Sequence, residues 1–238
     1  MRMRSTTPMT EQPVLTETDG ALRTIILNRP DRKNSLTGPL VTAVRAALAE
    51  AVSDDSVNAI LYRGAEGALC SGLDLKEFRA DPPPEWLPGF NREWAGFHLD
   101  MYNCPKPTVC ALERYAINAG SSFALANDFI VMGESAFLHV GEVAMGMAAP
   151  MNLAWLQLRG GRGAITELAL LGRRMSGEWL ERRGLVHAVV PDAEVVDKAR
   201  ELAQELAALP PQATSLMKAQ MRRFEAGVEP EALFAPRA

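Results

Sequence analysis

Short apolar segments alternate with helical periodicity along the first part of the chain, and this alternation limits the fold most strongly. Val14–Thr18 and Ala21–Leu27 have the composition of strands. The dipeptide Asp19-Gly20 between them predicts a two-residue type I′ turn with positive φ at both positions. Apolar residues then recur three and four positions apart over Pro39–Val52, which predicts a helix, and Ala59–Tyr62 has the composition of a buried strand. This order predicts a layered α/β sheet.

The later segments extend this pattern and then change it. Helices are expected at 92–102 and 119–127, and strands at 108–112 and 128–132. The stretch from Ala80 to Gly89 is rich in proline and predicts a lid-like surface segment. From Met151 onward the pattern is almost entirely helical, so a sheet-rich first part and a helical tail are expected.

Composition excludes several classes of function. The formal net charge of −4 does not favour nucleic-acid binding, which requires clustered cations. Cys70, Cys104 and Cys110 have neither CxxC spacing nor nearby paired histidines, so we expect free cytosolic thiols and no metal site. No apolar run is long enough to cross a bilayer, and residues 1–12 have the composition of a disordered leader. These features predict a cytoplasmic protein that binds no membrane.

Two short segments have the pattern of a turn that opens a helix. Cys70–Lys76 and Tyr115–Ser122 each follow an apolar strand and contain glycine or other small residues. Free backbone amides at a helix N-terminus can stabilise a developing negative oxygen, and small side chains allow close approach of a ligand. For the first segment alone, an ordinary glycine turn with Asp74 as a helix cap is the better explanation. For the second segment alone, tight helix packing explains the residues equally well.

A third segment, Phe137–Gly146, contains the lone carboxylate Glu142 in mostly apolar surroundings. Burial would raise the pKa of this carboxylate and suit it to act as a general base. A serine hydrolase is disfavoured, because Ser121 and Ser122 lie in no GxSxG motif and no sequence feature connects a histidine to them.

Taken together, these segments resemble the crotonase family, also called the enoyl-CoA hydratase/isomerase family, over about Ile25 to Met221. The shared motifs include the three segments above and several further stretches in the same order. The further stretches are Leu27-Asn28-Arg29-Pro30, Lys33-Asn34-Ser35-Leu36, Lys106-Pro107-Thr108-Val109, Asp128, Gly184-Leu185-Val186 and Val189-Val190-Pro191.

The resemblance implies the α/β crotonase (ClpP/crotonase-like) fold, a layered ββα superhelix with a helical C-terminal region. It divides the chain into a core at 13–150 and a helical trimerisation region at 151–238. It places two oxyanion donors at the amides of Leu73 and Ala119 and the catalytic carboxylate at Glu142. A second glutamate, usual in hydratases of the family, is replaced by Ser122. A single base suffices to shift a double bond, so the resemblance is greatest to Δ3,Δ2-enoyl-CoA isomerases.

The resemblance also implies the ligand contacts and the assembly. Coenzyme A enters as part of the substrate, with no separate cofactor, and the protein forms a homotrimer or hexamer. The expected substrate-binding residues are Gly72, Asp74, Asn118, Gly120 and Ser122, and the expected CoA-binding residues are Arg32, Lys33 and Lys76. Two alternatives stay open: an enoyl-CoA hydratase, and a non-catalytic acyl-CoA-binding scaffold of the same fold.

Overall fold

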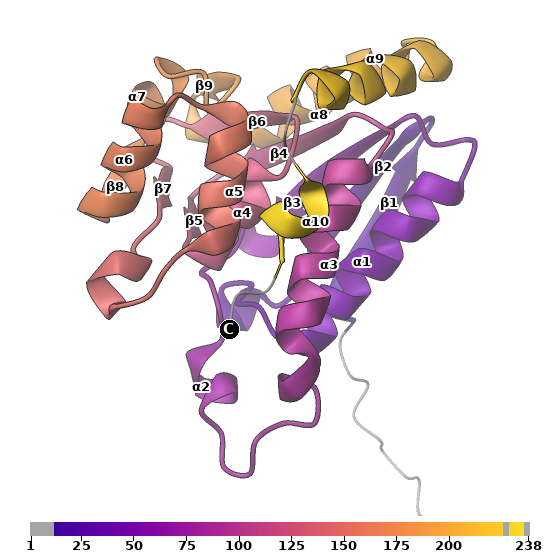
Figure 1. Ribbon diagram of the computed structural model, residues 1–238. Helices are drawn as coiled ribbons and strands as arrows, with labels where there is room; N and C mark the ends of the chain where they lie inside the picture. Colours follow the sequence, from indigo (N-terminus) through magenta and orange to yellow (C-terminus); the bar gives the residue numbers. More distant parts are fainter. Residues whose placement is uncertain (1–11, 226–228, 236–238) are drawn as a thin grey trace, which may run out of the picture.

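The computed structural model describes residues 12–225 and 229–235, and Figure 1 shows how their elements are arranged. The expected leader at 1–12 therefore lies outside the described residues, apart from Gln12. The predicted hairpin is present: β1 (Val14–Asp19) pairs antiparallel with β2 (Leu22–Leu27). Its turn is Gly20-Ala21, one residue later than predicted, because Asp19 still pairs with Leu22. Of these two turn residues, only Gly20 has positive φ, at 56°, whereas a type I′ turn needs it at both. The predicted turn type is therefore wrong.

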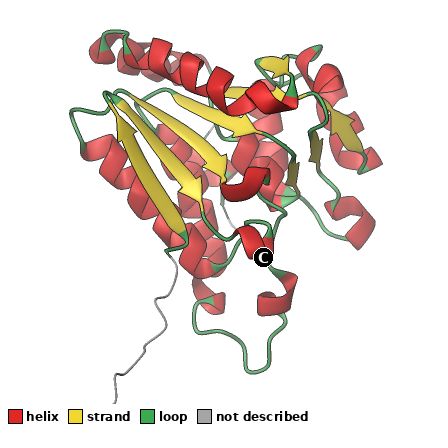
Figure 2. Cartoon of the chain, turned by 180° about the vertical axis from the view of Figure 1, so that it is seen from behind, coloured by secondary structure: helices red, strands yellow, loops and turns green. Residues whose placement is uncertain are grey.

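The hairpin belongs to a six-stranded sheet with the order β1-β2-β3-β4-β6-β9, seen in yellow in Figure 2. All neighbours after β2 run parallel. The remaining strands of this sheet are β3 (Ala59–Gly64), β4 (Thr108–Leu112), β6 (Phe129–Gly133) and β9 (Ala188–Val190). Strands buried on both faces read as continuous apolar runs. That explains why the sequence predicted β3, β4 and β6 within one or two residues.

Side chains of the large sheet alternate between two cores. In β3, Ile60 and Tyr62 pack into the main core, whereas Ala59 and Leu61 pack into a smaller one. The main core also holds the buried faces of α1 (Gly38–Ser53) and α3 (Phe90–Asn103). The smaller core is covered by α8 (Val195–Ala207). Helices on both faces are what a parallel sheet requires.

A second sheet has the order β5-β7-β8 and lies beside the first (Figure 1). Its strands are β5 (Tyr115–Ile117), β7 (Phe137–His139) and β8 (Arg174–Ser176). The chain passes from the large sheet to the second sheet and back, since β4 leads to β5 and β6 leads to β7. Each passage places a short loop and a helix start near the second sheet, and these loops contain the Ala119 and Glu142 parts of the candidate site.

Helices predominate after residue 150, as expected, but two strands lie among them. The helices here are α5 (Pro150–Arg159), α6 (Arg162–Leu171), α7 (Gly177–Glu181), α8, α9 (Pro211–Phe224) and α10 (Pro230–Leu233). The prediction missed β8 and β9, each three residues long, because such short segments carry no periodicity. Through them this region supplies an edge strand to both sheets.

The proline-rich segment forms an exposed loop between α2 (Leu75–Phe78) and α3, and Figure 1 shows that this loop protrudes from the rest of the chain. Its surface position agrees with the prediction. Elsewhere, short 3-10 turns connect the elements. These turns are η1 (Pro30–Arg32), η2 (Ala65–Gly67), η3 (Leu87–Gly89), η4 (Glu142–Met145) and η5 (Asp192–Glu194). No helix in the described part of the chain combines the length and hydropathy needed to span a bilayer.

Candidate active site

The two predicted oxyanion segments lie side by side. Cys70 and Ala116 form a parallel bridge, and the Ile117 amide donates a hydrogen bond of 3.1 Å to the Cys70 carbonyl. The start of α4 (Ala119–Leu125) packs so closely here that a Cβ on Gly120 would lie 2.4 Å from that same carbonyl oxygen. Glycine is therefore required at 120 by close backbone approach.

Each segment presents an amide that has no acceptor. Within the described residues, neither the Leu73 N–H nor the Ala119 N–H donates to a backbone or side-chain group. Two unusual backbone conformations precede them: Gly72 has φ of 94° and Asn118 has φ of 52°. A non-glycine residue with positive φ is uncommon and costs free energy, so surrounding contacts must hold Asn118 in place. The predicted donors are thus available to a ligand.

Asp74 fixes the first oxyanion segment, Cys70–Lys76, through its side-chain contacts. Its buried carboxylate accepts hydrogen bonds from Arg32 at 2.8 Å and from the Ser35 hydroxyl at 3.1 Å. It also caps α2 through the Glu77 amide, and Arg29 lies 3.4 Å away. Burial raises the pKa of Asp74, but these donors outweigh burial and hold the pKa at about 2. The carboxylate thus has its partners within the protein, while a substrate contact for Asp74 stays a prediction.

Glu142 begins the 3-10 turn η4 and is 8% exposed. Its Oε1 accepts a hydrogen bond of 3.0 Å from the Asn152 side chain in α5. Its Oε2 is buried and has no hydrogen-bond partner among residues 12–225 and 229–235. Burial raises the pKa of Glu142 above its ordinary value, and the Asn152 hydrogen bond opposes that rise. A buried carboxylate with one free oxygen and a raised pKa has the properties of a general base near neutral pH.

Two asparagines connect Glu142 to the second oxyanion segment. The Asn118 side-chain oxygen accepts from the Gly141 amide at 2.9 Å, one residue before Glu142. The Asn152 side-chain nitrogen donates to the Asn118 carbonyl at 3.0 Å as well as to Glu142. Both acceptors fix which way the Asn152 amide points, so its Oδ1 is the buried atom without a partner.

Sequence reasoning did not single out Asn152, and it assigned Asn118 to substrate contact. In the structure, the side-chain oxygen of Asn118 accepts a hydrogen bond from the loop that carries Glu142, while a substrate contact for Asn118 stays a prediction. The available signal for Asn152 was a lone amide within the apolar stretch Met151–Trp155. Buried polar groups in such stretches require hydrogen-bond partners. The identity of those partners follows only from the tertiary structure.

Ser122 lies one helical turn into α4 and belongs to a separate buried cluster. Its hydroxyl donates to the Ala119 carbonyl at 2.9 Å and lies 3.4 Å from His98 Nε2. The Trp155 indole N–H donates to His98 Nδ1 at 2.8 Å. His98 Nδ1 is therefore the acceptor nitrogen, and the proton of the neutral ring resides on Nε2. Such a ring cannot take a proton from Ser122, which excludes this pair as a hydrolase dyad.

The three predicted CoA-binding cations have different surroundings. Arg32 pairs with Asp74. Lys33 has φ of 53° and lines a surface cleft with Arg114 and Arg174. Lys76 is exposed on α2. No ligand contact of these residues is tested by the structure, and their CoA-binding roles stay predictions.

The sequence pattern of the family described as enoyl-CoA hydratase/isomerase matches residues 17–235. Among curated proteins, the chain is 30% identical over 209 residues to the 1,2-epoxyphenylacetyl-CoA isomerase of Escherichia coli, covering 86% of this chain and 80% of that protein. It is 32% identical over 211 residues to a probable enoyl-CoA hydratase of Mycobacterium tuberculosis, covering 88% and 81% of the two chains.

Solved structures agree with this likeness. A Pseudomonas aeruginosa protein superimposes with a TM-score of 0.83 at 27% identity, covering 96% of this chain and 99% of the other. An enoyl-CoA hydratase from Mycobacterium smegmatis gives a TM-score of 0.84 at 26% identity, covering 95% and 88%. The expected fold is thereby confirmed.

Proposed function

Because the chain belongs to the enoyl-CoA hydratase/isomerase family, we propose that it shifts the double bond of a 3-enoyl-CoA thioester to position 2. In this proposal the Leu73 and Ala119 amides donate to the thioester oxygen and Glu142 moves the proton. The observation that carries the proposal is the free, buried Oε2 of Glu142. That oxygen lies on a loop tied through Asn118 and Asn152 to the turn presenting the Ala119 amide.

The proton balance of this reaction needs one carboxylate. Glu142 Oε2 takes a proton from C2, and the electron pair delocalises over C1 to C4 with its charge on the thioester oxygen. Each amide that stabilises such an oxygen contributes about 3 kcal/mol in the transition state. The proton carried by Glu142 then returns at C4, which leaves the double bond between C2 and C3. The raised pKa of Glu142 favours both transfers, since base and acid forms are then accessible near neutral pH.

Ser122 favours isomerisation over hydration. Hydratases of the family usually carry a second glutamate at this position, whereas the Ser122 hydroxyl is committed to the Ala119 carbonyl. Hydration is the second candidate, and one observation supports it. Asn152 Oδ1 and Glu142 Oε2 are both buried acceptors without partners among the described residues, and hydration requires acceptors that can hold a water. The names of several relatives, including the probable hydratase of Mycobacterium tuberculosis, support the same alternative.

The decisive test supplies a panel of 3-enoyl-CoA thioesters, including an aromatic member, in heavy water. Isomerase activity predicts a rise in conjugated-thioester absorbance and deuterium at the α-carbon. Loss of that absorbance from 2-enoyl-CoA would identify a hydratase instead. Deuterium exchange at the α-carbon without either absorbance change would support an enolate intermediate but contradict both isomerisation and hydration. CoA binding without exchange would indicate a non-catalytic scaffold. Assembly as a trimer or hexamer is a further proposal, and sedimentation would measure it.

A further inference from the structure

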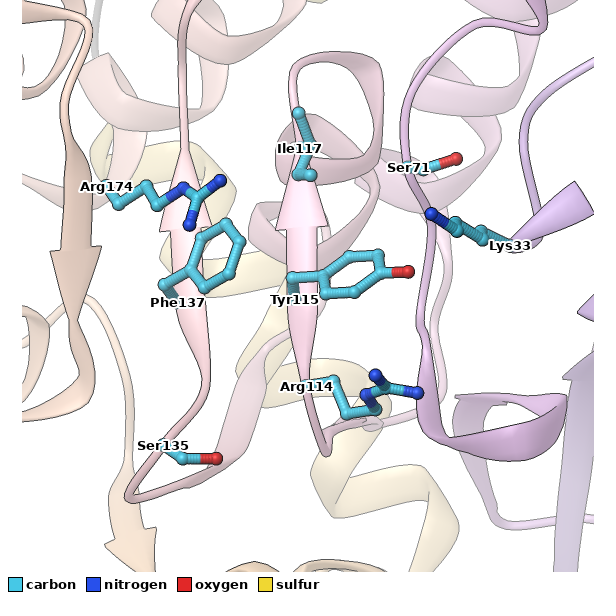
Figure 3. Close-up of a pocket in the computed structure, with 8 residues that line it drawn as sticks. All are labelled: Lys33, Ser71, Arg114, Tyr115, Ile117, Ser135, Phe137 and Arg174. Carbon is cyan, nitrogen blue, oxygen red and sulfur yellow. The ribbon is translucent and has the colours of Figure 1, made fainter.

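A cationic cleft of about 450 Å³ lies on the outer face of the second sheet (Figure 3). Its three cations come from distant parts of the chain: Lys33 follows β2, Arg114 precedes β5, and Arg174 begins β8. Figure 3 shows hydroxyl groups of Ser71, Tyr115 and Ser135 at the same cleft. Its volume lies in the range of small-molecule sites.

The cations of this cleft are electrostatically uncompensated. None of the three forms a salt bridge with an acidic group within the described residues. No carboxylate from the described part of the chain lines the cleft. Two acidic side chains beside lining residues have other partners, since Glu113 pairs with Arg63 and Asp192 accepts from the Ser135 amide. Three cations without an acidic partner among the described residues line this cleft, although the chain as a whole has a net charge of −4.

Aromatic rings hold both arginines in place. The Arg174 guanidinium lies 4.5 Å from the centre of the Phe137 ring, and the Arg114 guanidinium lies 5.8 Å from that of Tyr115. The two rings pack against each other with centroids 5.7 Å apart. Stacking on aromatic faces restricts a guanidinium while leaving its N–H donors free. The donors of Arg174 are therefore preorganised for an anion, whereas Arg114 lies near the limit of about 6 Å for such a contact.

We propose that this cleft binds a phosphate-bearing small molecule, with the two arginines and Lys33 neutralising the phosphate oxygens. Phosphate offers several charged acceptors in a compact group, and arginine donors match it in geometry and charge. The hydroxyls of Ser71, Tyr115 and Ser135 have no hydrogen-bond partner in the described chain and supply further donors. This site goes beyond the proposed isomerase reaction, whose reacting groups are Leu73, Ala119 and Glu142.

The cleft adjoins the oxyanion turns. Ser71 and Ile117 line the cleft, and each lies two residues before a predicted donor, Leu73 or Ala119. The bridge pair Cys70 and Ala116, each one residue before these lining residues, is fully buried. An anion in the cleft therefore contacts the same short segments that present the amides.

The test measures binding of inorganic pyrophosphate by calorimetry at physiological salt concentration. Wild-type protein is expected to bind it, and Arg114→Gln/Arg174→Gln is expected to weaken binding at least tenfold. Arg162→Gln removes an exposed arginine outside the cleft and serves as the matched control. Absence of binding by wild type, or equal weakening by the control, would overturn the proposal. Circular dichroism checks whether the double variant folds. If it does not fold, pyrophosphate binding is measured for Arg114→Gln and Arg174→Gln separately.

The phosphate could belong to the CoA part of a thioester or to a separate molecule. A second arm therefore measures the KM for 3-enoyl-CoA in the double variant. A raised KM together with lost pyrophosphate binding would assign the cleft to the CoA phosphates. An unchanged KM with lost pyrophosphate binding would assign it to a separate effector or substrate. This arm depends on the proposed activity, whereas the calorimetric arm does not, so failure of one is distinguishable from failure of the other.

Discussion

Two buried polar clusters meet at the start of α4, and they differ in whether their hydrogen-bonding capacity is filled. The first contains Asn118, Glu142 and Asn152, and two of its buried acceptors have no partner in the described part of the chain. The second contains His98, Ser122 and Trp155, and its contacts occupy both ring nitrogens and the hydroxyl. Unfilled buried acceptors cost free energy, and a ligand or water that completes them is one reason for a protein to retain them.

The same difference appears in the pKa values. Burial raises the pKa of Glu142 and so brings it closer to neutral pH. Burial lowers the pKa of His98 to about 3, which keeps the ring neutral at ordinary pH. One cluster therefore contains a group able to exchange a proton, and the other contains a group that cannot. The comparison indicates chemistry in the first cluster and packing in the second.

The largest expected effect comes from Glu142→Gln. The glutamine oxygen can still accept from Asn152, so the substitution removes the base while preserving the contact. Loss of a general base lowers the rate by about a thousandfold. Steady-state turnover of 3-enoyl-CoA measures this, with the exposed Glu134→Gln as control. Near-normal turnover of the Glu142→Gln variant would mean that another residue is the base. It would also contradict the assignment of chemistry to the first cluster.

His98→Asn tests the second cluster through its pH dependence. The folded pKa of about 3 lies below the unfolded value of about 6.5, so the unfolded chain binds the extra proton between these values. Folding stability should therefore fall as pH decreases below about 6.5, by about 1.4 kcal/mol per pH unit from this group alone. Urea unfolding at several pH values should show a shallower slope for the variant.

The matched control for that slope is His187→Asn, which removes an exposed imidazole. The comparison uses slopes because loss of the Trp155 and Ser122 partners also lowers stability at every pH. Equal slopes for wild type and His98→Asn would mean that His98 is not held neutral in the folded protein.

Asn152→Leu tests whether Asn152 sets the pKa and the orientation of Glu142 in the first cluster. Removing the Asn152 hydrogen bond removes an influence that lowers the pKa of Glu142, so that pKa should rise further. The acidic limb of the kcat profile should move to higher pH, and kcat at neutral pH should fall about tenfold as the base loses its orientation. A fall in stability without movement of the acidic limb would indicate a purely structural residue.

Ser122→Ala should have the smallest effect. It removes one hydrogen bond to the Ala119 carbonyl and leaves the His98 Nε2–H without a partner, which costs about 1 kcal/mol of stability. Turnover should stay within about twofold, because Ser122 contributes no proton transfer. Thermal unfolding and kinetics together measure this. A large loss of turnover in a folded variant would give Ser122 a chemical role.

The sequence predicted the elements whose signal is local. Continuous apolar runs indicated β3, β4 and β6, and ordered motifs indicated the segments around Leu73, Ala119 and Glu142. The hairpin turn was displaced by one residue, because Gly20 alone provides the positive φ that the turn needs. Prediction failed for β8 and β9, which are too short to show a period.

Features that depend on distant contacts could not be read from the sequence. Asn152 acts through residues that α5 brings near only in the folded chain. Arg114 and Arg174 are far apart in sequence and line one cleft because β5, β7 and β8 form one sheet, and Lys33 reaches the same cleft from the loop after β2. His98 and Ser122 come from different helices, so no local pattern joined them.

The buried bridge residue Cys70 makes the oxyanion turn measurable without substrate. Its thiol is fully buried, accepts a hydrogen bond of 3.4 Å from the Gly72 amide, and has its pKa raised to about 12 by burial. Because only a thiolate reacts rapidly with alkylating reagents, the closed turn protects Cys70 both sterically and chemically. The alkylation rate of Cys70 would therefore measure how often this oxyanion turn opens in the protein without substrate.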